Sequence, residues 1–175
     1  MAFSTTTHIL TYGTLLGTTI FHTFIGGIVS YKVLPRSYFA NLMAKIFPIY
    51  FSLQTVFPLV MALTYPSSRN PFGFASGIHG LRAQGKGVMF SLGFAAICGL
   101  ANLAVVGPET TRCMDVRRGQ EKKDGKKAYD APPHSEEMQA LNKRFSILHG
   151  VSSALNVGEL VALVGYGVHL AGRIA

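Results

Sequence analysis

The chain has 175 residues, of which 49% are hydrophobic and 14% are charged, and its formal net charge is +8. This charged fraction is well below the roughly 25% of a soluble domain, so the composition favours a polytopic membrane protein over a soluble one. A net positive charge can indicate nucleic-acid binding in a soluble protein. Here the cations lie between apolar stretches, where they set the orientation of the protein in the membrane, so we expect no nucleic-acid partner. Cys98 and Cys113 lie at different expected depths, and no disulfide is implied.

The first apolar stretch covers residues 9–31 and ends at Lys32, Pro35 and Arg36. Gly13 and Gly17 form a GxxxG pair on one face, a pattern that permits close helix packing in lipid. His22 lies on the other face. The first 31 residues contain no Asp, Glu, Lys or Arg, so they lack the features of a matrix presequence and of a secretory signal peptide. We expect this span to remain in the protein.

Two further spans are predicted at residues 46–63 and 88–106. Pro58 removes the amide hydrogen that would bond the carbonyl of Gln54, so a kink is expected beside that side chain. The glycine-rich segment between the spans is predicted to be a loop, with Phe72 and Phe74 at the membrane interface. In the third span Ala95 and Gly99 repeat the small-residue spacing, Asn102 lies near the end, and Gly107 and Pro108 are expected to end the helix.

A hydrophilic stretch follows, with nine Lys or Arg and seven Asp or Glu between Glu109 and Arg144. Residues 109–133 show no apolar periodicity and are predicted to be a flexible charged loop. After Pro133 apolar residues recur at helical spacing, which predicts an amphipathic helix that lies on the membrane and continues into a fourth span at residues 145–170.

The fourth span has both a polar face and a small-residue ridge. The polar face contains His149, Ser153 and Asn156, with Glu159 at its edge. The ridge on the opposite side consists of Gly150, Ala154, Gly158 and Gly165.

The distribution of cations predicts the orientation. The connections after the first and third spans hold twelve Lys or Arg, whereas the termini and the second connection hold four. The positive-inside rule therefore places the first and third connections in the cytosol and both termini on the opposite side.

Each span places an amide or imidazole in the cytosolic half of the membrane, judged from a helix rise of about 1.5 Å per residue. Three interpretations stay open: a hydrogen-bonded layer that fixes helix register; a path for a solute or proton lined by His22, Asn156 and Glu159; and a bis-histidine haem or metal site at His22 and His149. The first needs no ligand and is preferred. The predicted polar layer consists of His22, Gln54, Asn102, His149, Ser153, Asn156 and Glu159.

Four blocks of sequence resemble the transmembrane protein 205-like family: FHTFIGGIVSYKVLPR, FPIYFSLQTVFPLVMALTYP, NLAVVGPETTRCM and HSEEMQALNKRFSILHGVSSALN. The resemblance covers all four spans. It implies a small eukaryotic four-helix membrane protein whose activity is poorly defined, and it supplies no catalytic or cofactor residues. We therefore expect a eukaryotic endomembrane or the mitochondrial outer membrane as the location.

The sequence thus predicts an all-α membrane protein: one domain, residues 1–175, forming a four-transmembrane-helix bundle with a long cytosolic loop between helices 3 and 4. No nucleophile, carboxylate pair or metal-ligand spacing indicates an enzyme, so no catalytic residue, cofactor or metal is expected. The expected role is an accessory or scaffolding subunit in the lipid bilayer beside other membrane-protein subunits. The alternative is a solute, proton or metal-drug transport protein. Helix packing is assigned to Gly13, Gly17, Ala95, Gly99, Gly150, Ala154 and Gly158.

Overall fold

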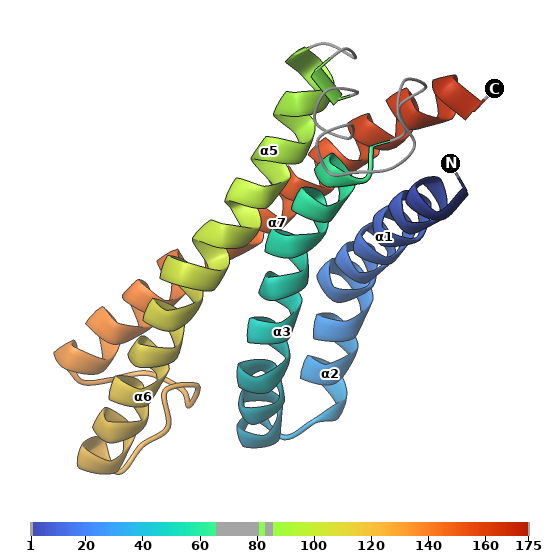
Figure 1. Ribbon diagram of the computed structural model, residues 1–175. Coiled ribbons are helices and arrows are strands. Elements are labelled where there is room, and N and C mark those ends of the chain that lie inside the picture. Colours follow the sequence, from blue (N-terminus) through green and yellow to red (C-terminus); the bar gives the residue numbers. More distant parts are fainter. Residues whose placement is uncertain (1, 66–80, 83–85, 175) are drawn as a thin grey trace.

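The part of the chain that the structure describes is all helical (Figure 1). The structure is a computed structural model and describes residues 2–65, 81–82 and 86–174. Four helical runs are long and apolar enough to cross a membrane, which identifies a multi-pass membrane protein. The first run consists of α1 (Ala2–Phe21), the π-helical turn η1 (His22–Gly26) and α2 (Gly27–Val33), and the second run is α3 (Arg36–Leu63). The third run consists of α5 (Lys86–Ala101), the π-helical turn η2 (Asn102–Val106) and α6 (Gly107–Asp124). The fourth run is α7 (Glu136–Ile174).

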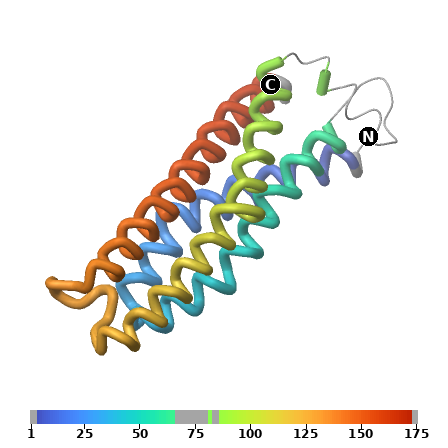
Figure 2. The backbone as a smooth tube through the Cα atoms, turned by 90° about the vertical axis from the view of Figure 1, so that its left-hand side faces the viewer, coloured from blue at the N-terminus to red at the C-terminus, as the bar shows by residue number. Residues whose placement is uncertain are grey.

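The two ends of the bundle differ in chemistry. Both termini lie at one end, and the α2–α3 turn and the α6–α7 connection lie at the other (Figures 1 and 2). The turn forms because Leu34 precedes a proline and adopts the extended conformation that this position favours, with φ −92° and ψ 142°. The two cation-rich connections therefore share one end of the molecule. Their cytosolic location remains a prediction.

Helices α3 and α5 approach each other closely where Gly99 lies against the backbone of Gln54. A Cβ atom on Gly99 would lie 2.6 Å from the carbonyl carbon and 2.8 Å from the carbonyl oxygen of Gln54. That carbonyl is the one that Pro58 leaves without its helical donor. Gly99 and Ala95 are both buried, so the small-residue spacing of the third span packs inside the bundle. The sequence predicted this face correctly.

Helix α5 lies between α3 and α7, and the apolar core surrounds it. Met61 of α3, Ala95 of α5 and Leu163 of α7 are completely buried together with Leu15 of α1. Large apolar side chains also point outward, for example Phe90, which is 70% exposed. In a membrane these outer side chains contact lipid. The bundle is therefore apolar on both its inner and its outer surfaces.

The third run corrects the prediction that Gly107 and Pro108 end the helix and that a charged loop follows. The helix continues as α6 to Asp124, where Gly125 closes it with a left-handed φ of 62°. The π-turn η2 explains the continuation: the N–H of Gly107 bonds the carbonyl of Asn102 five residues earlier, and Pro108 falls at the first turn of α6, where a missing N–H is tolerated.

The second half of the hydrophilic stretch contains the predicted helix, which runs without a break from Glu136 into the fourth span as α7. The start of α7 packs along α6: the guanidinium of Arg144 lies 2.7 Å from the carboxylate of Glu109, and Met138 is completely buried. Ser135 begins the helix, since its hydroxyl oxygen accepts the N–H of Met138 at 3.2 Å. These contacts join residues distant in sequence, so helical periodicity in either segment alone does not reveal them. The connection between helices is confined to residues 125–135.

The predicted interfacial loop with Phe72 and Phe74 lies outside the described residues.

We expect Gly99→Ala to destabilise the bundle by about 1–3 kcal/mol, because the added methyl group overlaps the backbone of Gln54 and the helices must separate. The measurement is thermal or chemical unfolding of the purified protein in detergent. Gly93→Ala is the matched control in the same helix, since a Cβ there meets nothing within 4 Å. Equal stability of the two variants would contradict the packing described for α3 and α5.

Candidate functional site

The centre of the bundle contains a direct hydrogen bond between two predicted polar residues. Asn102, completely buried, donates from Nδ2 to Oδ1 of Asn156 at 3.0 Å. The pair joins η2 to α7. Asn102 is the first residue of the π-turn, and such turns often occur at functional positions. The structure therefore brings Asn102 and Asn156 together.

A second group of polar side chains surrounds Gln54, which is also completely buried. Its Nε2 donates to the hydroxyl of Tyr50 at 2.9 Å, and its side chain faces the carboxyl group of Glu159. Glu159 has no exposed surface, and among the described residues neither of its carboxyl oxygens is in a hydrogen bond of good geometry. The structure thus places an acid and an amide from different helices side by side.

His22 approaches this group through an aromatic contact. Its ring centroid lies 4.7 Å from that of Tyr50 and 5.8 Å from that of Phe47. The histidine is half-buried and is the first residue of the π-turn η1. Tyr50 therefore lies between His22 and Gln54, and the three residues form a continuous line of side chains from α1 to the core.

Two predicted members do not join the layer. His149 and Ser153 are exposed, and the His149 ring stacks on Phe145 of its own helix with a centroid distance of 6.1 Å. The physical reason is the limited width of the helix contact: Glu159 and Ser153 are about 120° apart around a helix with 100° per residue, so the side of α7 that buries Glu159 turns Ser153 outward. His22 and His149 have different neighbours, which does not support a bis-histidine site.

The predicted packing glycines also divide into two groups. Gly158 packs against the ring of Phe94, which would lie 3.3 Å from an added Cβ. A Cβ on Gly13, Gly17 or Gly150 would meet nothing within 4 Å, and Ala154 is exposed. The latter four residues therefore face away from the bundle.

A second polar cluster lies near the end of the bundle that carries the termini. Thr64 donates its hydroxyl to the carbonyl of Val60 at 2.7 Å, so it accepts from Nδ1 of His8 across 3.3 Å. This assignment leaves Nε2 of His8 to accept the hydroxyl proton of Tyr166. His8 is completely buried. The three helices α1, α3 and α7 are therefore joined by one buried imidazole.

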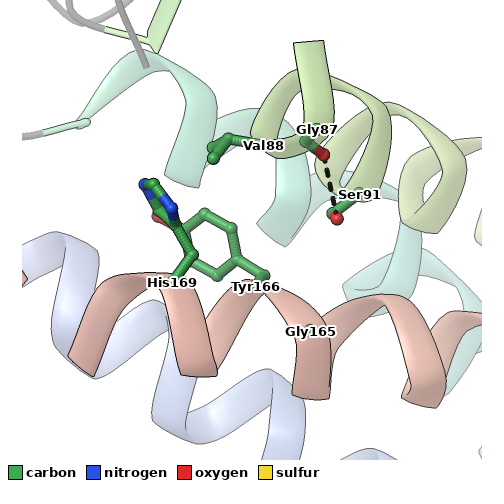
Figure 3. A pocket seen from close by; sticks show the side chains of 6 residues that line it. All are labelled: Gly87, Val88, Ser91, Gly165, Tyr166 and His169. Carbon is green, nitrogen blue, oxygen red and sulfur yellow. Dashed lines mark hydrogen bonds between the residues drawn. The ribbon is translucent and has the colours of Figure 1, made fainter. Parts of the chain in front are cut away.

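A cavity of about 310 Å³ lies beside this cluster, between the start of α5 and the last turns of α7. In Figure 3, Tyr166 and His169 extend from α7 toward Val88, and Ser91 donates to the carbonyl of Gly87 at 3.1 Å. Neither His22 nor Glu159 lines this cavity. The cavity and the central polar layer are separate features.

The chemistry of the central layer is that of one acid among neutral amides and a phenol. Within the described ranges no three His, Cys, Asp or Glu side chains are placed to hold a metal ion. A carboxyl group buried in a membrane protein is a functional hypothesis by default, because its charge is costly in lipid. Glu159 is therefore the residue of the layer that most strongly indicates a function.

Sequence reasoning missed Tyr50 and His8. The spacing of Tyr50 and Gln54 by four residues was a usable signal, since such residues are neighbours on one helix face. His8 was overlooked because the first span was expected to begin at residue 9, one residue after it. Its partners, Thr64 and Tyr166, lie at the ends of other helices, and no local pattern connects them.

Comparisons with known proteins give one family and one relative. Residues 10–119 match the family described as Domain of unknown function (DUF4149). This region contains Gln54 and Asn102 and ends before α7. A protein of Aspergillus fumigatus named xanthocillin biosynthesis cluster protein D is 29% identical over 167 residues, which are 95% of this chain and 88% of that protein. No solved structure matches the chain.

The hydrogen bond between Asn102 and Asn156 is expected to give a coupling energy of about 0.6 kcal/mol, and at most about 1.7 kcal/mol, as found for such bonds within membranes. A double-mutant cycle with Asn102→Leu and Asn156→Leu measures it from unfolding in detergent. His149→Leu is the control partner, because His149 is exposed and its effect should add to that of Asn102→Leu. Coupling of the control pair as large as that of the asparagine pair would contradict the assigned contact.

Proposed function

The chain belongs to the DUF4149 family, and from that premise we propose that it is a non-enzymatic accessory or scaffolding subunit of a larger membrane complex. The observation that carries the proposal is a set of small residues that the bundle does not use. Gly13 and Gly17 on α1 and Gly150 on α7 have nothing within 4 Å of an added Cβ. In lipid such residues allow a further helix to approach closely.

The contrast with Gly99 strengthens this argument. Gly99 has the same small-residue spacing, but it packs against Gln54 within this chain and is not free to contact another protein. The outward residues show the same spacing without an internal partner. A second protein whose helix crosses α7 near Gly150 and Ala154 would make the contact that Gly99 makes within the bundle.

The name of the Aspergillus relative supports a more specific form of the proposal. That relative is named as a protein of a biosynthesis cluster. By extension, the partners of this chain would be enzymes of a biosynthetic route held at the same membrane. The transmembrane protein 205-like resemblance and the eukaryotic location that it implies remain predictions alongside this proposal.

The pair of substitutions Gly150→Leu and Ala154→Leu is expected to reduce recovery of partner membrane proteins about tenfold, equivalent to about 1.4 kcal/mol of binding free energy. The leucines fill the space that a neighbouring helix would occupy. Affinity purification in a mild detergent followed by protein identification provides the measurement. Gly93→Leu is the matched control, because it adds the same side chain at an exposed glycine of α5 with open space around it.

Recovery of the wild-type chain alone, as a monodisperse monomer, would count against the accessory role. Equal loss of partners with Gly93→Leu would show that the effect is not specific to the α7 surface.

A transport protein for a solute, a proton or a metal-containing drug is the second candidate, with His22, Asn156 and Glu159 as its polar site. It is favoured by the buried carboxyl of Glu159, which has no hydrogen-bond partner among the described residues. It receives less support because the 310 Å³ cavity is lined by other residues.

Under the transport alternative, Glu159→Gln and His22→Ala should each reduce flux at least about tenfold in reconstituted vesicles, since each removes an ionisable group from the path. Vesicles containing His149→Ala, which alters an exposed histidine, are the control. Unchanged flux in both Glu159→Gln and His22→Ala would remove transport from consideration.

A further inference from the structure

Four buried oxygen atoms of the central layer accept no hydrogen bond of good geometry from any residue that the structure describes. They are the two carboxyl oxygens of Glu159, Oε1 of Gln54 and Oδ1 of Asn102. In each amide one of the two N–H groups donates to a neighbour, from Gln54 to Tyr50 and from Asn102 to Asn156. All three residues are completely buried. Buried acceptors without donors are rare in folded proteins and call for an explanation, such as an ion that binds there.

The four oxygens belong to one layer of the bundle. Gln54 faces Glu159, and the close contact of Gly99 with the backbone of Gln54 places the next turn of that run, which starts at Asn102, in the same region. Asn102 in turn bonds Asn156, one helical turn before Glu159. Residues from α3, η2 and α7 therefore contribute oxygen atoms to the same layer.

Charge balance indicates what would occupy this layer. Seven of the eight acidic residues lie between positions 109 and 137, and Glu159 is the remaining one. No Lys, Arg or His in the described part of the chain forms an ion pair with it. An isolated carboxylate is very unfavourable in an apolar interior unless a positive charge neutralises it. One carboxylate with neutral amide oxygens matches a charge of +1.

We propose that Glu159, Gln54 and Asn102 form a binding site for a single small monovalent cation, either a proton or Na⁺. The carboxylate supplies the charge, and the amide oxygens accept the proton or coordinate the ion, as hard oxygen ligands do. This inference goes beyond the accessory role and does not depend on partner binding. It also does not require net transport, since a cation that binds within the bundle would stabilise it.

A line of contacting side chains joins the layer to a half-buried residue. His22 is half-buried and contacts Tyr50, and Tyr50 accepts the hydrogen bond of Gln54. The titratable groups that face Glu159 are Tyr50 from α3 and Cys98 from α5. His22 from η1 is separated from it by Tyr50. Tyr50 and Cys98 therefore lie close enough to respond to the charge state of Glu159.

The test measures thermal unfolding of the full-length protein in detergent as a function of cation. The folded chain holds a cation that the unfolded chain releases, so stability must fall as that cation is removed. If Na⁺ binds, the unfolding temperature rises with NaCl and not with choline chloride at constant pH. If a proton binds, the temperature falls as the pH rises, by an amount that does not depend on Na⁺.

Glu159→Gln should abolish the Na⁺ dependence, or remove the part of the pH dependence that Glu159 contributes. Asp115→Asn is the matched control, because it removes an exposed acid of α6 and should leave the dependence unchanged. Identical Na⁺ and pH dependence in wild type and Glu159→Gln would overturn the proposal.

Infrared difference spectroscopy of the wild type keeps the proposal testable if Glu159→Gln does not fold. Spectra taken at high and low pH, and in Na⁺ and choline, should contain one carboxyl band from an apolar environment that changes with one of these cations. The other seven acids lie in the hydrophilic stretch and give bands typical of water. The absence of any apolar carboxyl change in both comparisons would overturn the proposal.

Discussion

The contact between Gly99 and the carbonyl of Gln54 determines how closely the helices of this bundle approach. Pro58 leaves that carbonyl without its helical donor, and only a residue without a side chain can cover it at the distance observed. The close approach of α5 to α3 then sets the position of the next turn of the third run, which begins at Asn102. The hydrogen bond from Asn102 to Asn156 extends the same layer to α7. The amide hydrogen that Pro58 lacks therefore influences how three of the four membrane-spanning runs pack together: α3, the run of α5 and η2, and α7.

The bundle buries a few polar side chains within an otherwise apolar interior and exposes apolar side chains on its outer surface. Large apolar side chains such as Val168, 71% exposed, face lipid, whereas Gln54 and Glu159 are completely buried. Polar groups in a membrane face the interior of a bundle because lipid offers no hydrogen bonds. This arrangement concentrates the buried polar residues in one layer, and the buried imidazole of His8 forms a second polar centre near the termini.

The two π-turns connect this layer to the ends of the molecule. Each begins at a polar residue, η1 at His22 and η2 at Asn102. A π-turn inserts an extra residue into the helix and changes the directions in which the following side chains point. In the third run it also lets the helix pass Gly107 and Pro108, so that α6 continues beyond the apolar region and pairs with the start of α7 through Glu109 and Arg144. The polar interior and the charged end of the bundle therefore depend on the same local irregularity.

The amino-acid sequence alone determined the helical class, the four apolar crossings, the packing face at Ala95 and Gly99, and most members of the polar layer, because apolar length and helical periodicity are local properties. The tertiary structure decided which polar residues meet. Asn156 faces η2 and Glu159 faces α3, whereas His149 and Ser153 face outward. Only the position of the neighbouring helices distinguishes these two sides of one polar sector. The tertiary structure also turned the predicted charged loop into α6, whose stabilising contacts join Glu109 to Arg144 and Cys113 to Leu141. Those pairs lie about thirty residues apart, beyond the range of any helical pattern.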